Sequence, residues 1–467
     1  MSTGGRVVVV GAGPNGLAAA IVAAQRGYRV EVFEAESIPG GGARTMELTL
    51  PGFHHDFGSA VHPMAVASPF FQSLPLHEYG LEWIHPPAPV AHPLDDGTAV
   101  TLERDLDDQV RALHRDGAAW KRLMRPYVTR WNEFAPAILR PILRIPKHPF
   151  LLAGFGARAV TSAQRFAELN FHDERTKALF AGCAAHSFLA LNEPLSTAVG
   201  LIMAITGHAV GWPIPRGGAQ SLTNALIQHL ESLGGTVHTS QRVEQLSALG
   251  SFDFAFCDVT PRQFLKFATF DGAYARLLQR YRYGPGIFKV DYALSSAIPW
   301  QAGDCHRAAT VHLGGTLDQI AASERSVRSG DHAERPFVLL AQPTLFDPTR
   351  APAGKHIAWA YCHVPNGSQF DMLPRLEAQI ERFAPGFRDC VIERRVWKTA
   401  DMEAADANLV GGDIVGGLAN WRQFFLRPTW RQYRTPLKNV FLCSASTPPG
   451  GGVHGMCGAN AAEIAFT

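Results

Sequence analysis

The sequence predicts an α/β protein in which a Rossmann-like domain with a parallel sheet is joined to an α+β domain built on a mixed or antiparallel sheet. Three observations predict this fold. A β-branched strand at residues 6–10 runs directly into a glycine-rich loop and a helix of small residues. A second strand at 28–34 completes a βαβ unit. Beyond residue 285 the chain contains segments such as residues 287–294, whose alternating polarity fits a half-buried antiparallel strand.

Length and composition set the limits of the interpretation. With 467 residues the chain is too long for one ordinary domain, and its formal net charge of only +2 gives no indication of nucleic-acid binding. The seven cysteines are scattered singly, without a C-x-x-C pair, so we expect neither a disulfide framework nor a metal site. No apolar run approaches the roughly 18 residues of a membrane span. We therefore expect a cytoplasmic protein.

The first glycine-rich loop is the strongest chemical signal. Residues 11–16 read Gly-Ala-Gly-Pro-Asn-Gly, a G-x-G-x-x-G pattern that follows a strand and opens a helix. A doubly anionic pyrophosphate is bound by unpaired amides at a helix N-terminus, and side chains at the glycines would block its approach. We therefore expect a dinucleotide pyrophosphate over Gly11, Gly13 and Gly16.

Glu34 ends the second strand about 20 residues after this loop. An acid at this position accepts hydrogen bonds from the hydroxyl groups of a ribose. It also disfavours a 2′-phosphate, so NADP is not expected at this site.

A second glycine turn, residues 39–45, follows the acid with the pattern G-G-x-A-R-T. By itself it could be a flexible surface loop. Together with G-x-G-x-x-G and the acid, however, it resembles the two-dinucleotide-binding-domain flavoproteins, a group that includes amine oxidases and phytoene desaturases. In that family Gly41, Gly42, Ala43 and Arg44 would complete the pyrophosphate cradle of a non-covalent FAD, with Arg44 countering the phosphate charge.

Two further segments carry the resemblance toward the phytoene-desaturase-like members. Residues 50–63 resemble the stretch that leads from pyrophosphate to flavin ring, and residues 433–455 resemble the C-terminal flavin motif. These motifs most resemble those of a subgroup named for a pyridine nucleotide-disulphide oxidoreductase domain. The C-x-x-C pair that a disulphide oxidoreductase needs is not present in this sequence. The resemblance implies FAD contacts at Gly11, Gly13, Pro14, Asn15, Gly16, Glu34, Ala35, Gly41, Gly42, Ala43, Arg44, Gly58, Ser59, Ala60, Val243, Ser444, Gly451, Gly452, Val453 and Met456.

Changes of composition along the chain predict two discontinuous domains. A glycine turn and apolar helix at 216–233 return the chain to the first domain, and residues 252–261 resemble the point where the family leaves it again. We assign 1–74, 216–262 and 410–467 to the FAD-binding domain, and 75–215 and 263–409 to the substrate domain.

One segment, residues 135–160, mixes apolar side chains with Arg140, Arg144, Lys147 and Arg158, and its four prolines limit it to short helices. Basic residues beside apolar ones lie against membrane surfaces in some proteins, which would make this one peripheral to a membrane. The alternative is a lid or packed helices of the substrate domain.

Flavin chemistry asks little of side chains, because N5 of the flavin accepts the hydride. His62 and His454 lie in segments expected near the ring and are the candidates for proton removal, with a structural hydrogen-bonding role as the alternative. Residues 450–455 formally spell a second G-x-G-x-x-G, but the strand does not lead directly into it and no second βαβ unit follows. A nicotinamide site is therefore not expected there.

The leading functional hypothesis is an FAD-dependent oxidoreductase that removes hydride from an apolar, isoprenoid- or lipid-like substrate and forms a double bond. Oxygen, a quinone or another acceptor would reoxidise the flavin. The alternatives are a flavin-dependent non-redox isomerase, an amine oxidase, and a binding or scaffold protein in which FAD is structural.

Overall fold

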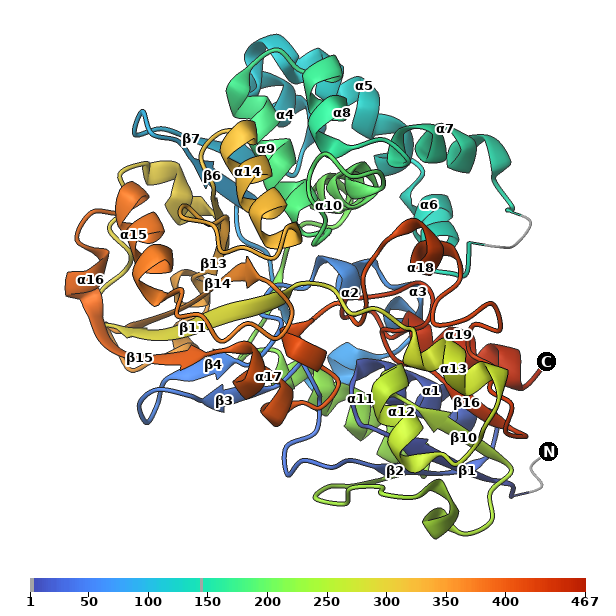
Figure 1. Cartoon of the computed structure of the whole chain (residues 1–467). Coiled ribbons are helices and arrows are strands. Elements are labelled where there is room, and N and C mark those ends of the chain that lie inside the picture. The colour runs from blue at the N-terminus through green and yellow to red at the C-terminus, as the bar shows by residue number, and fades with distance from the viewer. Residues whose placement is uncertain (1–3, 143–145) are drawn as a thin grey trace.

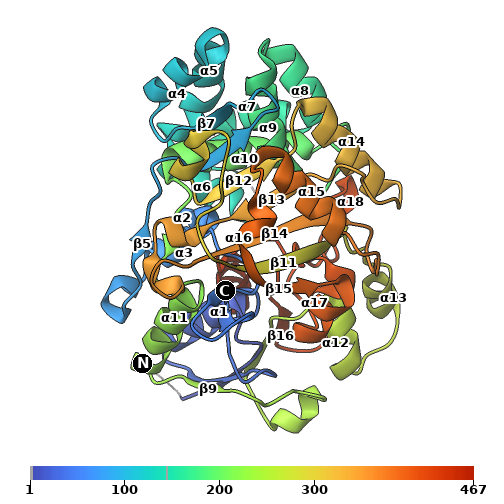
Figure 2. The same ribbon diagram turned by 90° about the vertical axis from the view of Figure 1, so that its left-hand side faces the viewer.

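The protein is built from two β-sheets and a layer of helices. The computed structural model describes residues 4–142 and 146–467, so Leu143, Arg144 and Ile145 of the basic-apolar segment lie outside the described residues. Figure 1 shows one sheet beside both ends of the chain, a second sheet on the opposite side, and helices above them. The view in Figure 2 places the second sheet between the helical layer and the first sheet.

The first sheet is five-stranded within the described part of the chain, and all its strand pairs are parallel. Val7, Val8 and Val9 are fully buried, as expected for a strand covered on both faces. The strands come from stretches that are far apart in the sequence. In spatial order they are β16 (Val440–Leu442), β10 (Phe254–Cys257), β1 (Arg6–Val10), β2 (Arg29–Phe33) and β9 (Thr236–His238).

Helices cover both faces of this sheet. One face packs against α1 (Pro14–Gln25), α11 (Gln220–Ser232) and α19 (Met456–Ala465). The other packs against α12 (Pro261–Phe267) and α13 (Ala273–Gln279). The buried alanines of α1 let it approach its neighbours closely. Gly458 of α19 lies so near α1 that a Cβ atom there would be 1.7 Å from the carbonyl oxygen of Asn15.

The second sheet is seven-stranded within the described residues and antiparallel except where β12 meets β6. In spatial order its strands are β15 (Val391–Trp397), β11 (Gly286–Leu294), β14 (His356–Val364), β13 (Val338–Ala341), β12 (Thr310–Leu313), β6 (Val90–Pro93) and β7 (Ala99–Leu102). The expectation that β11 is half-buried was wrong, because all nine residues are buried. Helices α15 (Leu373–Phe383) and α16 (Phe387–Cys390) cover one face, while Phe57 and Trp359 pack with Ile287 on the other.

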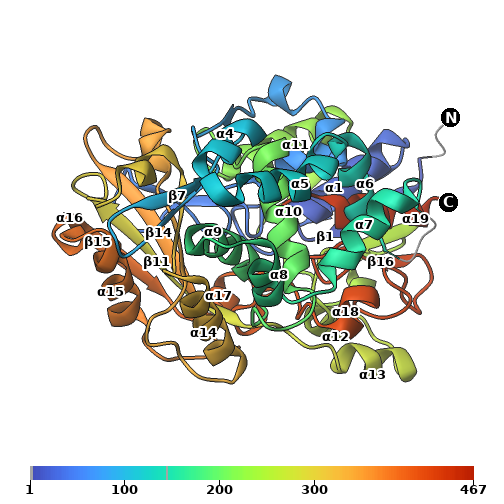
Figure 3. The ribbon, with the colours of Figure 1, turned by 90° about the horizontal axis from the view of Figure 1, so that it is seen from above.

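A helical layer completes the substrate domain. Seen from above in Figure 3, it extends from beside the second sheet to the region over α1. Its core is rich in aromatic rings, with Trp120, Phe134, Phe171 and Phe180 nearly inaccessible to solvent. The helices are α4 (Leu106–Ala112), α5 (Gly117–Val128), α6 (Trp131–Ile138), α7 (Pro149–Ala159), α8 (Ala163–Asn170), α9 (Glu174–Ala185), α10 (Ser196–Ala209) and α14 (Leu317–Arg328).

Short elements connect these layers. They are β3 (Thr45–Glu47) paired with β4 (His54–Asp56), β5 (Trp83–Ile84) paired with β8 (Ile214–Pro215), and the helices α2 (Pro63–Ala67), α3 (Pro69–Gln72), α17 (Thr399–Ala405) and α18 (Trp421–Phe425). The predicted fold class, a parallel Rossmann-like sheet with a mixed-sheet α+β partner, is confirmed. The exact domain boundaries remain a prediction. Among the described residues, no helix is long and apolar enough to cross a membrane.

A buried ion pair lies on β11. Lys289 Nζ donates to the Asp291 carboxylate at 2.6 Å, and Trp397 Nε1 donates to the same carboxylate at 2.8 Å. Burial lowers the pKa of Lys289, and the Asp291 charge opposes that shift. Each charge therefore needs the other to remain in the core.

We predict that Asp291→Ala destabilises the protein by about 3–5 kcal/mol, because it leaves the Lys289 ammonium buried without an anion. The double variant Lys289→Met/Asp291→Leu should recover most of the loss, since it removes both charges. Asp108→Ala, which breaks the exposed pair with Arg111, should cost under about 1 kcal/mol. Thermal and urea unfolding of the four proteins measures this. An Asp291→Ala variant as stable as the wild type would contradict the prediction.

Candidate functional site

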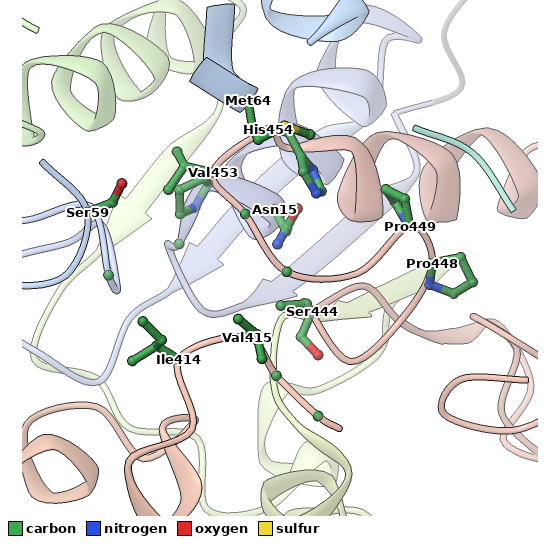
Figure 4. A pocket seen from close by; sticks show the side chains of 18 of the residues that line it. Asn15, Ser59, Met64, Ile414, Val415, Ser444, Pro448, Pro449, Val453 and His454 are labelled. Atoms are coloured by element: carbon green, nitrogen blue, oxygen red, sulfur yellow. The ribbon is translucent and has the colours of Figure 1, made fainter. Parts of the chain in front are cut away.

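A large cavity runs from the first sheet to the second. Its volume is about 1480 Å³, which is larger than the roughly 300–1,000 Å³ of a usual small-molecule pocket. Residues from both ends of the chain line it, and Figure 4 shows Asn15 and Ser59 near Ser444, Val453 and His454 around the same space. The cavity has room for a cofactor and a second molecule beside it.

The first glycine loop lies at one end of this cavity. Gly11 has φ of +100°, which strains any other residue. A Cβ atom at Gly16 would lie 2.0 Å from the carbonyl oxygen of Gly11, and one at Gly13 would lie 2.8 Å from Asp258 Oδ2. α1 begins at Pro14. The glycines are therefore required by the close contacts of this loop with itself and with Asp258 at the N-terminus of the helix.

Glu34 links the end of β2 to that loop. Its Oε2 atom accepts from the Ala12 N–H at 2.7 Å, and its Oε1 atom accepts from the Glu36 N–H at 3.0 Å. The side chain is nearly buried yet lines the cavity. Each carboxylate oxygen has a further lone pair available for a ribose hydroxyl.

The second glycine turn is fixed by Arg44. The Arg44 guanidinium donates to Gly41 O at 2.7 Å and to Ala405 O at 3.0 Å, and it lies over the Phe57 ring. A Cβ atom at Gly58 would lie 2.5 Å from Gly42 O, so two segments of the chain are in close contact there. These contacts hold the turn in place and are not those of a flexible surface loop, whereas its role as a cofactor cradle stays a prediction.

The structure brings most of the predicted FAD contacts together on one surface. Gly16 and Met456 are buried but do not line the cavity. The predicted residues that do line it are Gly11, Gly13, Pro14, Asn15, Glu34, Ala35, Gly41, Gly42, Ala43, Arg44, Gly58, Ser59, Ala60, Val243, Ser444, Gly451, Gly452 and Val453.

Both candidate catalytic histidines line the cavity in neutral form. Burial lowers the pKa of His62 to about 4 and the pKa of His454 to about 4. His62 Nε2 donates to Ser59 O at 3.1 Å, which leaves its Nδ1 lone pair without a partner among the described residues. His454 Nδ1 instead accepts from the Met456 N–H at 3.0 Å. This bond favours a structural role for His454.

Asp258 belongs to the site but was missed by sequence reasoning. Its Oδ2 atom accepts from the Gly16 N–H at 2.8 Å. Burial raises the pKa of Asp258 to about 7, the Gly16 bond opposes this, and nearby Asp406 and Glu34 raise it further. The available signal was its place directly after the strand at 254–257, because the carboxyl ends of neighbouring parallel strands meet at one edge.

The far part of the cavity is mostly apolar and aromatic. Its lining includes Phe155, Phe188, Ile202, Trp212, Leu339, Trp359 and Tyr361. The exceptions include the hydroxyl of Thr310 and the indole nitrogen of Trp359, neither of which has a hydrogen-bond partner in the described part of the chain. His186 Nε2 lies 3.0 Å from His312 Nε2, and burial lowers the pKa of His186 to about 3. This lining suits an uncharged, largely apolar molecule.

Comparison with known proteins supports the predicted class, an FAD-dependent oxidoreductase similar to the phytoene desaturases. Residues 9–74 match the family model of the NAD(P)-binding Rossmann-like domain. All-trans-zeta-carotene desaturase of Myxococcus xanthus is 23% identical over 96% of this chain and 90% of its own length. Pyridine nucleotide-disulfide oxidoreductase domain-containing protein 2 of Rattus norvegicus is 25% identical over 98% of this chain and 93% of its own. The predicted resemblance is therefore confirmed.

Solved structures agree on the fold. An oxidoreductase from Methanosarcina mazei superposes with a TM-score of 0.64 at 17% identity and covers 99% of both chains. Putrescine oxidase bound to putrescine gives 0.62 at 15% identity, again over 99% of both chains. At such identity these matches establish the shared architecture.

We predict that Asp258→Asn changes how the stability of the cofactor-free protein depends on pH. Because the folded-state pKa of about 7 exceeds the ordinary value of 3.8, the stability that protonated Asp258 contributes is fully present below about pH 4 and is lost as pH rises through 7. Across that window the loss is at most about 4 kcal/mol. The amide oxygen of the substituted side chain can still accept from the Gly16 N–H, so the variant should lose this dependence and keep the contact.

Thermal unfolding midpoints between about pH 5 and about pH 8 measure the effect. Asp304→Asn, at an exposed position, is the control and should follow the wild type. Parallel pH profiles of Asp258→Asn and the wild type would refute this assignment.

Proposed function

We propose that the cavity binds non-covalent FAD. The adenosine ribose would lie at Glu34, the pyrophosphate over Gly11, Gly13 and the Arg44 turn, and the flavin toward residues 451–453. The fit rests on the glycine positions that have no room for a Cβ atom and on the N-terminus of α1, which begins at the cavity wall. Asn15, whose Oδ1 atom has no hydrogen-bond partner among the described residues, also lines the cavity and would be an additional polar contact for the cofactor (Figure 4).

We further propose that the protein oxidises an apolar, isoprenoid- or lipid-like substrate by hydride transfer, with formation of a double bond. The single observation that most supports this proposal is that the predicted dinucleotide site and the apolar far part of the cavity belong to one continuous cavity. A bound flavin supplies the hydride acceptor. Phe188, Leu339 and Trp359 would hold the substrate and exclude water, and His62, which also lines the cavity, would lie beside it.

Two other activities remain candidates because proteins with these activities have structures similar to that of this chain. A fatty acid isomerase from P. acnes has a TM-score of 0.57, and cyclohexylamine oxidase from Brevibacterium oxydans has 0.61. Isomer turnover that requires prereduced flavin would select the isomerase. An amine substrate is less compatible with the mostly apolar far part of the cavity. A scaffold protein in which FAD is structural would show neither activity.

A membrane surface is the proposed source of the substrate. Arg140, Ile142 and Lys147 line the cavity, and Ile142 is 48% exposed. Phe150 at the start of α7 is 90% exposed. Exposed apolar side chains among cations match an anionic bilayer surface, from which an apolar molecule could reach the cavity without crossing water.

We predict that the purified protein is yellow and that Gly13→Val abolishes most FAD binding, because the branched side chain would meet Asp258 and the phosphate path. Gly303→Val is the control, since a Cβ atom there meets nothing within 4 Å. Flavin content after gel filtration and titration with FAD measure both. A colourless wild type that takes up no FAD would rule out the cofactor.

We predict that phytoene, used as the probe, bleaches the flavin band under anaerobic conditions, whereas NADH and NADPH do not. The sequence supplies one βαβ fingerprint with its acid, and FAD would occupy it. Oxygen or a quinone should then restore the oxidised spectrum. Stopped-flow absorbance measures these rates. Rapid, saturable bleaching by either nucleotide would reveal a second nucleotide site and contradict the proposal.

We predict that the protein sediments with anionic vesicles and that Phe150→Ser together with Lys147→Gln weakens this association by about 1 kcal/mol for the lost charge, plus an apolar contribution. Leu169→Ser is a matched control, because Leu169 is 73% exposed on α8 and does not line the cavity. Absence of wild-type sedimentation would favour the lid interpretation of residues 135–160.

A further inference from the structure

Arg427 is a buried cation that the proposed function has not yet used. It follows α18, its side chain lines the cavity, and the residue is only 7% exposed. A buried guanidinium is normally paired with a carboxylate, because an isolated charge loses several kcal/mol of hydration in a protein interior.

Arg427 makes only weak contacts with neutral groups. Nη2 donates to Gly417 O at 3.2 Å and to the Tyr281 hydroxyl at 3.4 Å. Nε has no hydrogen-bond partner, and no carboxylate oxygen lies within 4.0 Å of the guanidinium among the described residues. This positive charge therefore has no direct carboxylate partner in the described part of the chain.

The nearby acid Asp413 is occupied by the backbone. Its Oδ2 atom accepts from the Gly284 N–H at 2.7 Å, and its Oδ1 atom accepts from the N–H groups of Val415 and Gly416 at 2.8 and 3.1 Å. Burial raises the pKa of Asp413, and its backbone hydrogen bonds and the Arg427 charge oppose that shift. Asp413 shapes the loop and does not pair directly with Arg427.

The position of Arg427 indicates where its missing anion belongs. A Cβ atom at Gly450 would lie 2.2 Å from Arg427 Nη1, so the guanidinium packs directly on that glycine. Gly450 opens the loop that leads through residues 451–453 of the cavity wall to the N-terminus of α19. The partial positive charge of this ten-residue helix and the Arg427 cation therefore occupy the same loop.

We propose that Arg427 stabilises the negative charge that develops on the flavin pyrimidine when the flavin is reduced. This inference rests on the proposed binding of FAD. The cofactor would provide the anion that the protein lacks, and the cation would make reduction more favourable. Arg427 thus acts as an electrostatic contact of the cofactor, without taking or giving a proton.

Sulfite provides a direct probe of such a charge. It adds reversibly to N5 of oxidised flavin, forms one N–S bond without an external oxidant, and leaves negative charge on the pyrimidine. We expect the yellow wild type to form this adduct. Arg427→Met should weaken sulfite binding about 10- to 100-fold, as expected for loss of a unit charge at close range, and should lower the flavin reduction potential.

Arg427→Lys keeps the charge and should remain within about threefold of the wild type. Arg307→Met removes a cation outside the cavity, paired with Glu103, and is the control. Tyr281→Phe removes one neutral partner and should leave sulfite affinity nearly unchanged. Absorbance titration gives the affinities, and dye equilibration gives the potentials.

The outcomes separate the two proposals. Colourless protein refutes FAD binding, whereas yellow wild type that forms no sulfite adduct refutes the role of Arg427 even if Arg427→Met fails to fold. Equal sulfite affinities in wild type and Arg427→Met refute it as well. Octanoate tests the other source of an anion: if it perturbs the flavin spectrum through Arg427 and competes with sulfite, the cation holds a substrate carboxylate and the flavin assignment is overturned.

Discussion

The contact between α1 and α19 is the constraint on which the site depends. Gly458 leaves no space for a side chain against the carbonyl oxygen of Asn15, so the two helices pack with their backbones nearly touching. One helix follows the first glycine loop and the other follows the C-terminal loop. This packing contact therefore sets the distance between the two loops that line the cavity.

Acidic side chains surround the first glycine loop, and few positive charges offset them. Glu34, Asp258 and Asp406 all line the cavity, and Arg44 of the second glycine turn is one of the cations that line it with them. A dinucleotide would bring two more negative charges into this surrounding. Backbone amides and the α1 dipole offset part of that repulsion, and protonation of Asp258 would offset more. Cofactor affinity in such a site reflects the protonation of the protein as well as its shape.

The sequence predicted the parts of the site that depend on local backbone geometry. Glycines at 11, 13, 16, 41 and 42 are informative because their chemistry acts over a few neighbouring residues, and the family resemblance then added the C-terminal loop. Asp258 and Arg427 were harder, since their roles come from burial and from contacts with distant segments. β11 was misjudged for the same reason: alternation of polarity does not reveal that Lys289 and Asp291 neutralise each other inside the core.

The order of strands in the first sheet has a consequence for how the chain folds. β1 and β2 are made first, yet their sheet is completed by β16 at one edge, more than 400 residues later in the sequence. Pairing between such distant segments is slow, and incomplete parallel sheets expose edges that favour aggregation. During synthesis the first βαβ unit stays exposed on the face that α19 later covers, until the rest of the chain has been made. Chaperone protection, or early capture of the adenosine end of the cofactor, would be most valuable during that interval.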